Sequence, residues 1–264
     1  MSGFANIVCQ RDGTLGRITL NRPEQRNPLD RVTAHEILEA FRVHLADDAV
    51  RSIVVTGAGP AFCAGGDLQQ MKEFSTMSSE EALEWPAAIV DLHQLMLTAG
   101  KPVIAAVNGP AFAGGMGLAG MCDIVLATRS ARFAMPEVRV GLFPMIIVAH
   151  LVRSLPRKPL LEMMLTGEPI DAEEAHRLGL VNRVLDDVDA LNAAVLEYAE
   201  RFTAVSPSAV RLGRRAFTLM ADMPAYQALD AAQFFNLALF FGDDLREGAD
   251  AFLNKRKPGW TSPD

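Results

Sequence analysis

The chain has 264 residues, half of them hydrophobic, and a formal net charge of −7 at pH 7. This apolar content suffices for one large domain, or for a core with a smaller appendage. The acidic balance argues against a nucleic acid or an anionic membrane as a partner. Three widely spaced cysteines in apolar contexts, Cys9, Cys63 and Cys122, and an N-terminus without a signal-peptide pattern predict a reduced, cytoplasmic protein.

The first hundred residues alternate between strand and helix patterns. The predicted elements are a β-hairpin at 7–10 and 15–20, a polar loop at 21–28, a helix from Asp30 to about Asp47, a buried strand at 52–56, a glycine-rich turn at 57–66 and a helix at 79–99. Asp67 follows the glycine-rich turn, and we expect it to cap a helix rather than to act as a base.

The segment from Lys101 to Asp123 has no charge between its two ends. A membrane-spanning helix is disfavoured, because two prolines and five glycines would leave it kinked and weak. We instead predict a buried strand at 103–107, a polar turn and a glycine-rich entry into a helix. Because strand, glycine turn and helix occur both here and at 52–73, we expect a parallel α/β architecture.

Residues 115–120 also satisfy the G-x-G-x-x-G pattern of dinucleotide-binding proteins, with Glu137 about where a ribose-binding acid would lie. In such proteins the first glycine ends the strand itself, within the opening βαβ unit. Here a long turn at 108–114 separates the strand from the motif. A nucleotide-binding dehydrogenase is therefore the weaker interpretation.

The second half of the chain is mostly helical. The predicted elements are strands at 124–127, 131–134 and 181–185, and helices at about 144–154, 157–166, 171–178, 187–204, 207–221 and 224–241. We place a sheet-containing core at 1–200 and a helical part at 201–264. The last predicted helix has more apolar surface than one small unit can bury, so we expect oligomerisation through it.

The two glycine turns carry a functional signal. Glycines ahead of a helix let backbone N–H groups come close to a ligand oxygen, with the helix dipole behind them. One donor near Gly66 and another near Gly114 would form an oxyanion hole, in which each donor is worth roughly 2.7–4 kcal/mol to a transition state. The alternative is that both turns are only tight connections.

Glu137 is the candidate acid/base. Apolar residues at 135–136 and 140–148 would remove water from its carboxyl group and raise its pKa; a solvated loop glutamate is the alternative. Cys63 has no histidine at a suggestive position. The five histidines have no metal-ligand spacing, and we interpret them as structural or surface residues. We expect no metal and no redox cofactor.

Segments along nearly the whole chain resemble the enoyl-CoA hydratase/isomerase (crotonase) superfamily. They are NRPEQRNPL at 21–29, FCAGGDL at 62–68, AAVNGPAFAGG at 105–115, CDI at 122–124, FAMPEVRVGLFP at 133–144, LTGEPIDAEEAHRLGLVNRV at 165–184 and FLNKRKPGW at 252–260. The order of these segments makes the resemblance specific, and it displaces the dehydrogenase interpretation.

The resemblance implies an α/β fold: a crotonase-like spiral of repeated ββα turns, with a C-terminal helical part that forms a homotrimer or a hexamer. It implies an acyl-CoA substrate whose thioester oxygen is held by the backbone N–H groups of Gly66 and Gly114 as it becomes an enolate. Contacts with the substrate or its CoA part are implied for Arg26, Ala64, Asp67, Leu68, Gly141, Leu142, Lys255 and Lys257.

One departure from the family pattern concerns the reaction. Hydratases of this family resemble one another in having two glutamates, but here the first position is Gly117 and the second is Glu137. Hydration divides its work between two carboxylates, whereas moving a double bond from C3–C4 to C2–C3 needs one base. We therefore predict an isomerase that uses Glu137 alone. If the missing carboxylate is what limits hydration, Gly117→Glu should raise it, and no gain would indicate that the shape of the pocket matters more. A hydratase of low activity, a decarboxylase, a thioester hydrolase and a non-catalytic acyl-CoA-binding protein are the alternatives.

Overall fold

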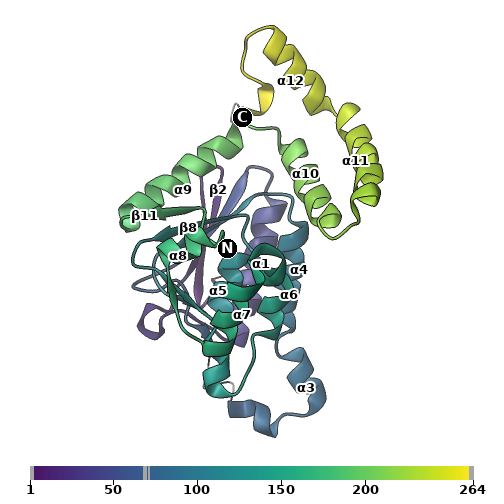
Figure 1. Cartoon of the computed structure of the whole chain (residues 1–264). Coiled ribbons are helices and arrows are strands. Elements are labelled where there is room, and N and C mark those ends of the chain that lie inside the picture. The colour runs from purple at the N-terminus through teal and green to yellow at the C-terminus, as the bar shows by residue number, and fades with distance from the viewer. Residues whose placement is uncertain (1–2, 68–69, 71, 262–264) are drawn as a thin grey trace.

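A six-stranded sheet forms the centre of the protein in the computed structural model, which describes residues 3–67, 70 and 72–261 (Figure 1). In spatial order its strands are β1 (Ile7–Asp12), β2 (Leu15–Leu20), β4 (Ser52–Gly57), β6 (Val103–Val107), β8 (Ile124–Thr128) and β11 (Arg183–Leu185). The pair β1–β2 is the predicted antiparallel hairpin, and all other neighbours run parallel. The predicted parallel α/β architecture is confirmed.

Side chains of the central strands point alternately to two apolar layers, because successive residues of a strand face opposite sides. In β4, Ile53 and Val55 face the larger layer, and Val54 faces the other. The larger layer is covered by α1 (Arg31–Ala46), α4 (Ala87–Thr98), α5 (Gly114–Gly120), α6 (Met145–Ser154), α7 (Arg157–Thr166) and α8 (Ala172–Arg177). The smaller layer is covered by α9 (Val188–Thr203).

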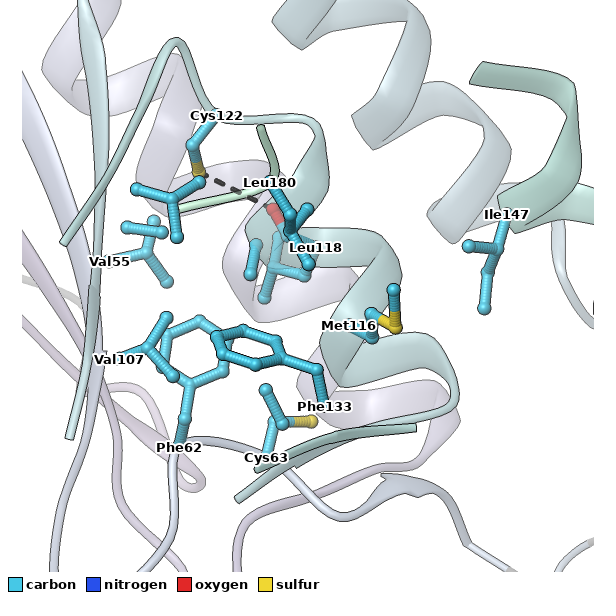
Figure 2. Close-up of a cluster of buried hydrophobic side chains, with 14 of the residues drawn as sticks. Val55, Phe62, Cys63, Val107, Met116, Leu118, Cys122, Phe133, Ile147 and Leu180 are labelled. Atoms are coloured by element: carbon cyan, nitrogen blue, oxygen red, sulfur yellow. Dashed lines mark hydrogen bonds between the residues drawn. The ribbon is translucent and has the colours of Figure 1, made fainter. Parts of the chain in front are cut away.

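The larger layer is dense around α5. Figure 2 shows Met116 and Leu118 of this helix near Phe62, Phe133 and Val107, all of them almost fully buried. The Cys122 thiol just beyond the helix donates to the Leu118 carbonyl oxygen at 3.4 Å. This packing fixes α5, whose first residue is Gly114, against the sheet.

Two small sheets lie at the glycine turns. One pairs β3 (Pro28–Leu29) with β5 (Gly65–Gly66), and the other has the order β10 (Ile170–Asp171), β9 (Arg132–Ala134) and β7 (Ala111–Phe112). A single bridge between Cys63 and Ala111 joins the two turns. The short 3₁₀ helices are η1 (Pro23–Gln25), η2 (Lys72–Thr76), η3 (Pro136–Val140) and η4 (Gly259–Thr261).

Helix ends follow the local chemistry of the sequence. Asp30 caps α1 as predicted, accepting from the backbone N–H of Thr33 at 2.7 Å. The single helix predicted at 79–99 is wrong, because α3 (Ser79–Glu84) ends before Pro86, and α4 begins after it. Proline has no N–H to continue the helical ladder. The helix that Asp67 was expected to cap falls on residues 68, 69 and 71, which lie outside the described residues.

The C-terminal helices extend away from the sheet (Figure 1). They are α10 (Pro207–Met220), α11 (Ala225–Phe240) and α12 (Asp243–Leu253), and α12 was not predicted. Helix α11 has no buried residue, and Phe241 just beyond it is 80% exposed. The proposed boundary near residue 200 falls inside α9 and stays a prediction. Across the described residues, no helix is long and apolar enough to cross a membrane.

Candidate active site

The two glycine turns lie directly against each other. The backbone N–H of Phe112 donates to the Cys63 carbonyl oxygen at 2.9 Å. A Cβ on Gly65 would lie 2.5 Å from the Cβ of Ala113, and a Cβ on Gly115 would lie 2.5 Å from the Cys63 carbonyl oxygen. Gly65 also has a φ of +91°, which side chains rarely permit. Only glycines allow this approach, which brings Gly66 and Gly114 to one place.

Helix α5 begins at a strained residue. Ala113, its N-cap, has φ 49° and ψ −124°, and its backbone N–H donates to the Ala134 carbonyl oxygen at 2.8 Å. A non-glycine residue persists in such a conformation only where its surroundings hold it there, and this strain is common at active sites. The bond to β9 is one such restraint, and it also links Gly114 to the strand that leads to Glu137.

A cavity of about 700 Å³ opens beside these turns. Its lining includes five residues expected from the sequence, namely Ala64, Gly66, Asp67, Glu137 and Leu142. It also includes Arg22, Gln25, Pro28, Ala113, Pro136, Arg139 and Val140, which the sequence analysis did not select. Gly114 is not in the lining but directly follows Ala113, which is. The predicted carboxylate and one predicted backbone donor thus share a cavity.

Glu137 lies in η3, which starts with Pro136 and is followed by its C-cap residue Gly141, whose φ of 83° is in the left-handed region. Its Oε2 atom is buried and has no hydrogen-bond partner. Burial raises the pKa of the carboxyl group above its ordinary value, against a smaller lowering by its own backbone N–H. The predicted direction of the pKa shift is confirmed. Gly141 shapes the end of η3 and is not in the cavity lining.

The space beside Gly117 is already filled. A Cβ on Gly117 would lie 2.8 Å from Cγ1 of Ile147 and 3.3 Å from its Cδ1 and Cγ2. Ile147 is labelled in Figure 2 and is only 5% exposed. A glutamate at position 117 therefore has no room in this packing. The sequence does not show this contact between α5 and α6, which opposes a gain of hydration by Gly117→Glu alone.

The basic residues are arranged differently from the sequence expectation. The side chain of Arg26 is exposed and does not line the cavity. The backbone carbonyl oxygen of Arg26 accepts a hydrogen bond from the N–H of Ala64 at 2.9 Å. Arg22 lines the cavity instead; its guanidinium pairs with Asp30 and lies 4.0 Å from Asp67. The loop was recognised as basic, but the side chain in the cavity is Arg22.

Two further predicted contacts are not brought to the cavity of this chain, and a third cannot be placed. Lys255 and Lys257 are exposed and follow α12, in the helical part that extends from the core, and neither is in the cavity lining. Leu68 lies outside the described residues. Their expected roles in CoA binding stay predictions.

Two buried asparagines hold the first glycine turn in place. The side-chain N–H groups of Asn27 donate to the carbonyl oxygens of Ala58 and Ala61, each at 2.9 Å. Those of Asn108 donate to the Gly59 carbonyl oxygen at 2.9 Å. The sequence showed both residues only as turn formers, because their partners are thirty or more residues away.

The remaining chemical candidates are Cys63 and clusters of possible metal ligands. Burial raises the pKa of the Cys63 thiol to about 12, so it is not a nucleophile at neutral pH. Among the described residues, no cluster of three or more His, Cys, Asp or Glu residues has the geometry to hold a metal ion. Glu137 and the backbone N–H groups of the glycine turns stay the candidates for the chemistry of the site.

Comparison with known proteins gives the class. The family described as enoyl-CoA hydratase/isomerase matches residues 10–263. An enoyl-CoA hydratase of Mycobacterium smegmatis has a crystal structure with a TM-score of 0.91 and 34% identity, covering 98% of this chain and 100% of that one. The chain therefore belongs to the enoyl-CoA hydratase/isomerase family and has the crotonase fold with C-terminal helices.

Particular relatives span the same length. A mitochondrial enoyl-CoA hydratase of Pongo abelii is 34% identical, with 97% of this chain and 88% of that protein covered. Enoyl-CoA hydratase domain-containing protein 3 of Danio rerio, also mitochondrial, is 35% identical, with 100% and 91% covered. The crystal structure of the human protein of that description has a TM-score of 0.88 at 29% identity.

Proposed function

We propose that this enzyme moves the double bond of a 3-enoyl-CoA to the 2 position, with Glu137 as the only acid/base. Glu137 removes a proton from C2, and the backbone N–H groups of Gly66 and Gly114 stabilise the charge that develops on the thioester oxygen. The same carboxyl group then returns the proton to C4. The electron pair of the broken C2–H bond forms the new double bond between C2 and C3, the pair of the former C3–C4 double bond forms the new C4–H bond, and no other reactant is consumed.

The observation that carries the proposal is the environment of Glu137. Its Oε2 is buried without a partner in the cavity that Gly66 also lines. A carboxylate with a buried oxygen that accepts no hydrogen bond is a stronger base than a fully paired one, because its charge is less stabilised by the protein. Val140 and Leu142 line the cavity beside it, which suits an apolar acyl chain.

The second observation is the pair of Gly117 and Ile147. Hydration needs a group to activate water in addition to one that protonates carbon, and position 117 supplies no side chain. The buried Ile147 occupies the space next to it. A site with no carboxylate at position 117 favours proton transfer between two carbons over addition of water.

Hydration of a 2-enoyl-CoA by Glu137 alone is the second candidate. It is favoured by the names of the relatives, since those from Mycobacterium smegmatis and Pongo abelii are described as enoyl-CoA hydratases. Decarboxylation and thioester hydrolysis would use the same oxyanion hole. A non-catalytic acyl-CoA-binding role would leave the unpartnered Glu137 without a purpose.

The test is the absorbance of the conjugated enoyl thioester. Purified protein is added to a 3-enoyl-CoA and, separately, to a 2-enoyl-CoA. We expect a rise with the 3-enoyl substrate, little change with the 2-enoyl substrate, and loss of the rise in Glu137→Gln while acyl-CoA binding persists. A fall with the 2-enoyl substrate would replace the proposal by hydration, and an unaffected Glu137→Gln variant would show that another group is the base.

Two further proposals concern assembly and location. We propose that α11 mediates assembly of three or six copies, because aromatic residues on it and just beyond its end are exposed in the single chain: Phe234, Phe240 and Phe241. A mass of one subunit in gel filtration would contradict this. A cytoplasmic location is in line with bacterial relatives, although other relatives are mitochondrial.

A further inference from the structure

The short helix η3 carries Glu137 but is not held in place by burial. None of its residues is buried. The Glu137 carboxyl group accepts from its own backbone N–H, and its Oε2 atom accepts no hydrogen bond. The place of this carboxyl group is therefore set by the backbone of η3, and the contacts that hold this backbone decide where the proposed base lies.

Arg139 supplies the hydrogen bonds that connect η3 to a neighbouring element. Its Nε–H donates to the carbonyl oxygen of Thr166, the last residue of α7, at 3.3 Å. Its guanidinium also donates to the carboxylate of Glu168, two residues further along the chain. In the part of the chain that the structure describes, the other hydrogen bonds of η3 stay within it or reach the two residues directly beyond its end. Arg139 thus joins η3 to the turn between α7 and β10.

Gly167 lies in the middle of that turn and contacts the same short helix. Its φ of +67° is in the left-handed region that favours glycine. A Cβ on Gly167 would lie 3.1 Å from Cα of Pro136 and 3.0 Å from Nε of Arg139. Because Pro136 directly precedes Glu137, the turn contacts η3 at two points, just before the proposed base and two residues after it.

The turn between α7 and β10 is itself anchored on both sides. Helix α7 buries Met163 and Met164 in the larger apolar layer, and the N–H of Gly167 donates to the Met163 carbonyl oxygen at 2.9 Å. On the other side of the turn, β10 pairs with β9, and Ile170 lies opposite the fully buried Phe133. The turn can therefore act as a fixed support for η3.

The ion pair of Arg139 and Glu168 contributes little to the stability of the fold. Their side chains are 50% and 71% exposed, and exposed ion pairs are weakened by solvent and salt. Its placement, however, joins the helix that carries the proposed base to a fixed turn. Precise placement matters for a reacting group, because a displacement of about 1 Å can cost about 10²-fold in rate.

We propose that Arg139 and Gly167 are positioning residues, which hold η3 against the turn between α7 and β10 so that the Glu137 carboxyl group keeps its place in the cavity. Glu168 serves as the second acceptor for the Arg139 side chain. The inference rests on the proposed function in taking Glu137 as the acid/base. Neither Gly167 nor Glu168 is in the cavity lining, so their effect on the reaction passes through η3.

The first test measures the pKa of Glu137 and does not depend on turnover. Nuclear magnetic resonance of the ¹³C-labelled glutamate carboxyl groups follows the titration, and Glu137→Gln assigns the signal. In Arg139→Gln we expect this pKa to fall toward its ordinary value of 4.5, because a loosened η3 admits water to a carboxyl group whose pKa is raised by burial. Loss of the positive charge alone would raise the pKa instead. The other charged residues of the cavity lining, Arg22 and Asp67, are kept in every variant.

Gly167→Ala tests the second contact without changing a charge. The new Cβ would press against Pro136, so we expect the pKa of Glu137 to change in this variant too. Gly13→Ala is the matched control, because Gly13 has a φ of +61° and a Cβ there would meet no atom within 4 Å. Both variants carry the backbone strain of a left-handed alanine, but Gly13→Ala should leave the pKa of Glu137 unchanged.

The second test measures isomerisation of a 3-enoyl-CoA. We expect Arg139→Gln to lower kcat about tenfold and to change KM less than about twofold, because a displaced base affects the reacting step more than binding. Arg139→Lys keeps the charge but lacks the planar fork that reaches both Thr166 and Glu168, so it should resemble Arg139→Gln. The control is Arg177→Gln, which breaks an exposed ion pair with Glu174 on α8 and should leave kcat unchanged.

Two results would overturn the inference. A raised or unchanged pKa of Glu137 in Arg139→Gln would show that Arg139 acts by its charge or has no influence on the base. A higher KM at constant kcat would show that Arg139 contacts the substrate rather than supports Glu137.

The inference and the proposed function can fail separately. If no 3-enoyl-CoA is isomerised, but the pKa of Glu137 falls in Arg139→Gln, the proposed reaction is wrong and the support of Glu137 by the turn stands. If a 3-enoyl-CoA is isomerised, and neither Arg139→Gln nor Gly167→Ala changes the pKa of Glu137 or kcat, the reaction stands and the inference is wrong.

Discussion

Replacing Gly117 by alanine isolates the contact between α5 and α6. Alanine inside a helix is favoured over glycine by roughly 0.5–1 kcal/mol. The new Cβ, however, would lie 2.8 Å from Cγ1 of Ile147, an atom in the middle of a buried side chain. Overpacking of this kind typically costs roughly 1–3 kcal/mol. We expect the cost of overpacking to exceed the helix preference of alanine. Gly117→Ala should then lower the free energy of unfolding by about 1 kcal/mol, measured by urea denaturation.

A matched control separates the two terms. Gly213 lies within α10, and a Cβ there would meet no atom within 4 Å. Gly213→Ala should therefore show the helix preference alone and raise the free energy of unfolding by roughly 0.5–1 kcal/mol. If both alanine variants were stabilised equally, the space beside Gly117 would be larger than the contact with Ile147 implies.

Replacing Ile147 by alanine completes a double-mutant cycle with Gly117→Ala. Ile147→Ala alone should cost roughly 2–5 kcal/mol, because it leaves a cavity. The double variant should cost at least about 1 kcal/mol less than the sum of the two single changes, because the new methyl group enters the space that isoleucine left. Additivity within about 0.5 kcal/mol would show that the residues do not share this space.

The contact between Gly117 and Ile147 also determines whether a glutamate at position 117 can support hydration. We expect Gly117→Glu to destabilise the protein without creating hydratase activity. The variant that combines it with Ile147→Ala has room for the carboxylate and should gain hydration of a 2-enoyl-CoA, measured as loss of enoyl absorbance. Equal gains in the single and double variants would refute the assignment of Ile147 as the obstacle.

Three further predictions follow from the site and the core. Because the pKa of Glu137 is raised and the base must be ionised, kcat/KM should fall as the pH drops through a value above 4.5, and Glu137→Asp should shift this limb; a pH-independent rate down to pH 4.5 would contradict this. His93 and His150 have pKa values of about 4 and about 3 in the folded protein against 6.5 in the unfolded chain, so each should cost the protein about 3 kcal/mol of stability as the pH falls from about 6.5 to about 4. His93→Phe should reduce this pH dependence in urea titrations without removing it, because His150 remains. Asn27→Ala removes the hydrogen-bond donor to the carbonyl groups of Ala58 and Ala61 and should lower the free energy of unfolding by roughly 1–3 kcal/mol. We also expect a lower kcat, because the adjacent glycine turn is held less firmly. An unchanged midpoint of unfolding would contradict this prediction.

Local signals in the sequence predicted most of the fold. The buried runs at 52–56 and 103–107 became neighbouring parallel strands, and Asp30 became the cap of α1. Two errors were also local. Pro86 marked a helix break that was overlooked, and Asp243 with Asp244 in the first turn of α12 was a usable start signal.

The site was predictable where its chemistry belongs to one short segment. Two glycine turns and a glutamate among apolar residues pointed to backbone donors and a raised pKa, and the structure brings the turns together beside the cavity. Contacts between segments were not predictable. The partners of Asn27, the obstruction of Gly117 by Ile147 and the pairing of His93 with His150 depend on how helices and loops pack, and no local pattern encodes them.

The polar atoms that the fold leaves unpaired are the strongest guide to its function. Around the cavity, Asn27 and Asn108 have their hydrogen bonds completed, and Arg22 is paired with Asp30. Against that background, the unpartnered oxygen of Glu137 and the unpartnered ring nitrogens of His93 and His150 are exceptions. Local rules of polar pairing fail mainly where function requires it, since a group already satisfied by the protein cannot also bind a ligand. Among the described residues that line the cavity beside the glycine turns, Glu137 is the one with such an atom, which supports its proposed role as the acid/base.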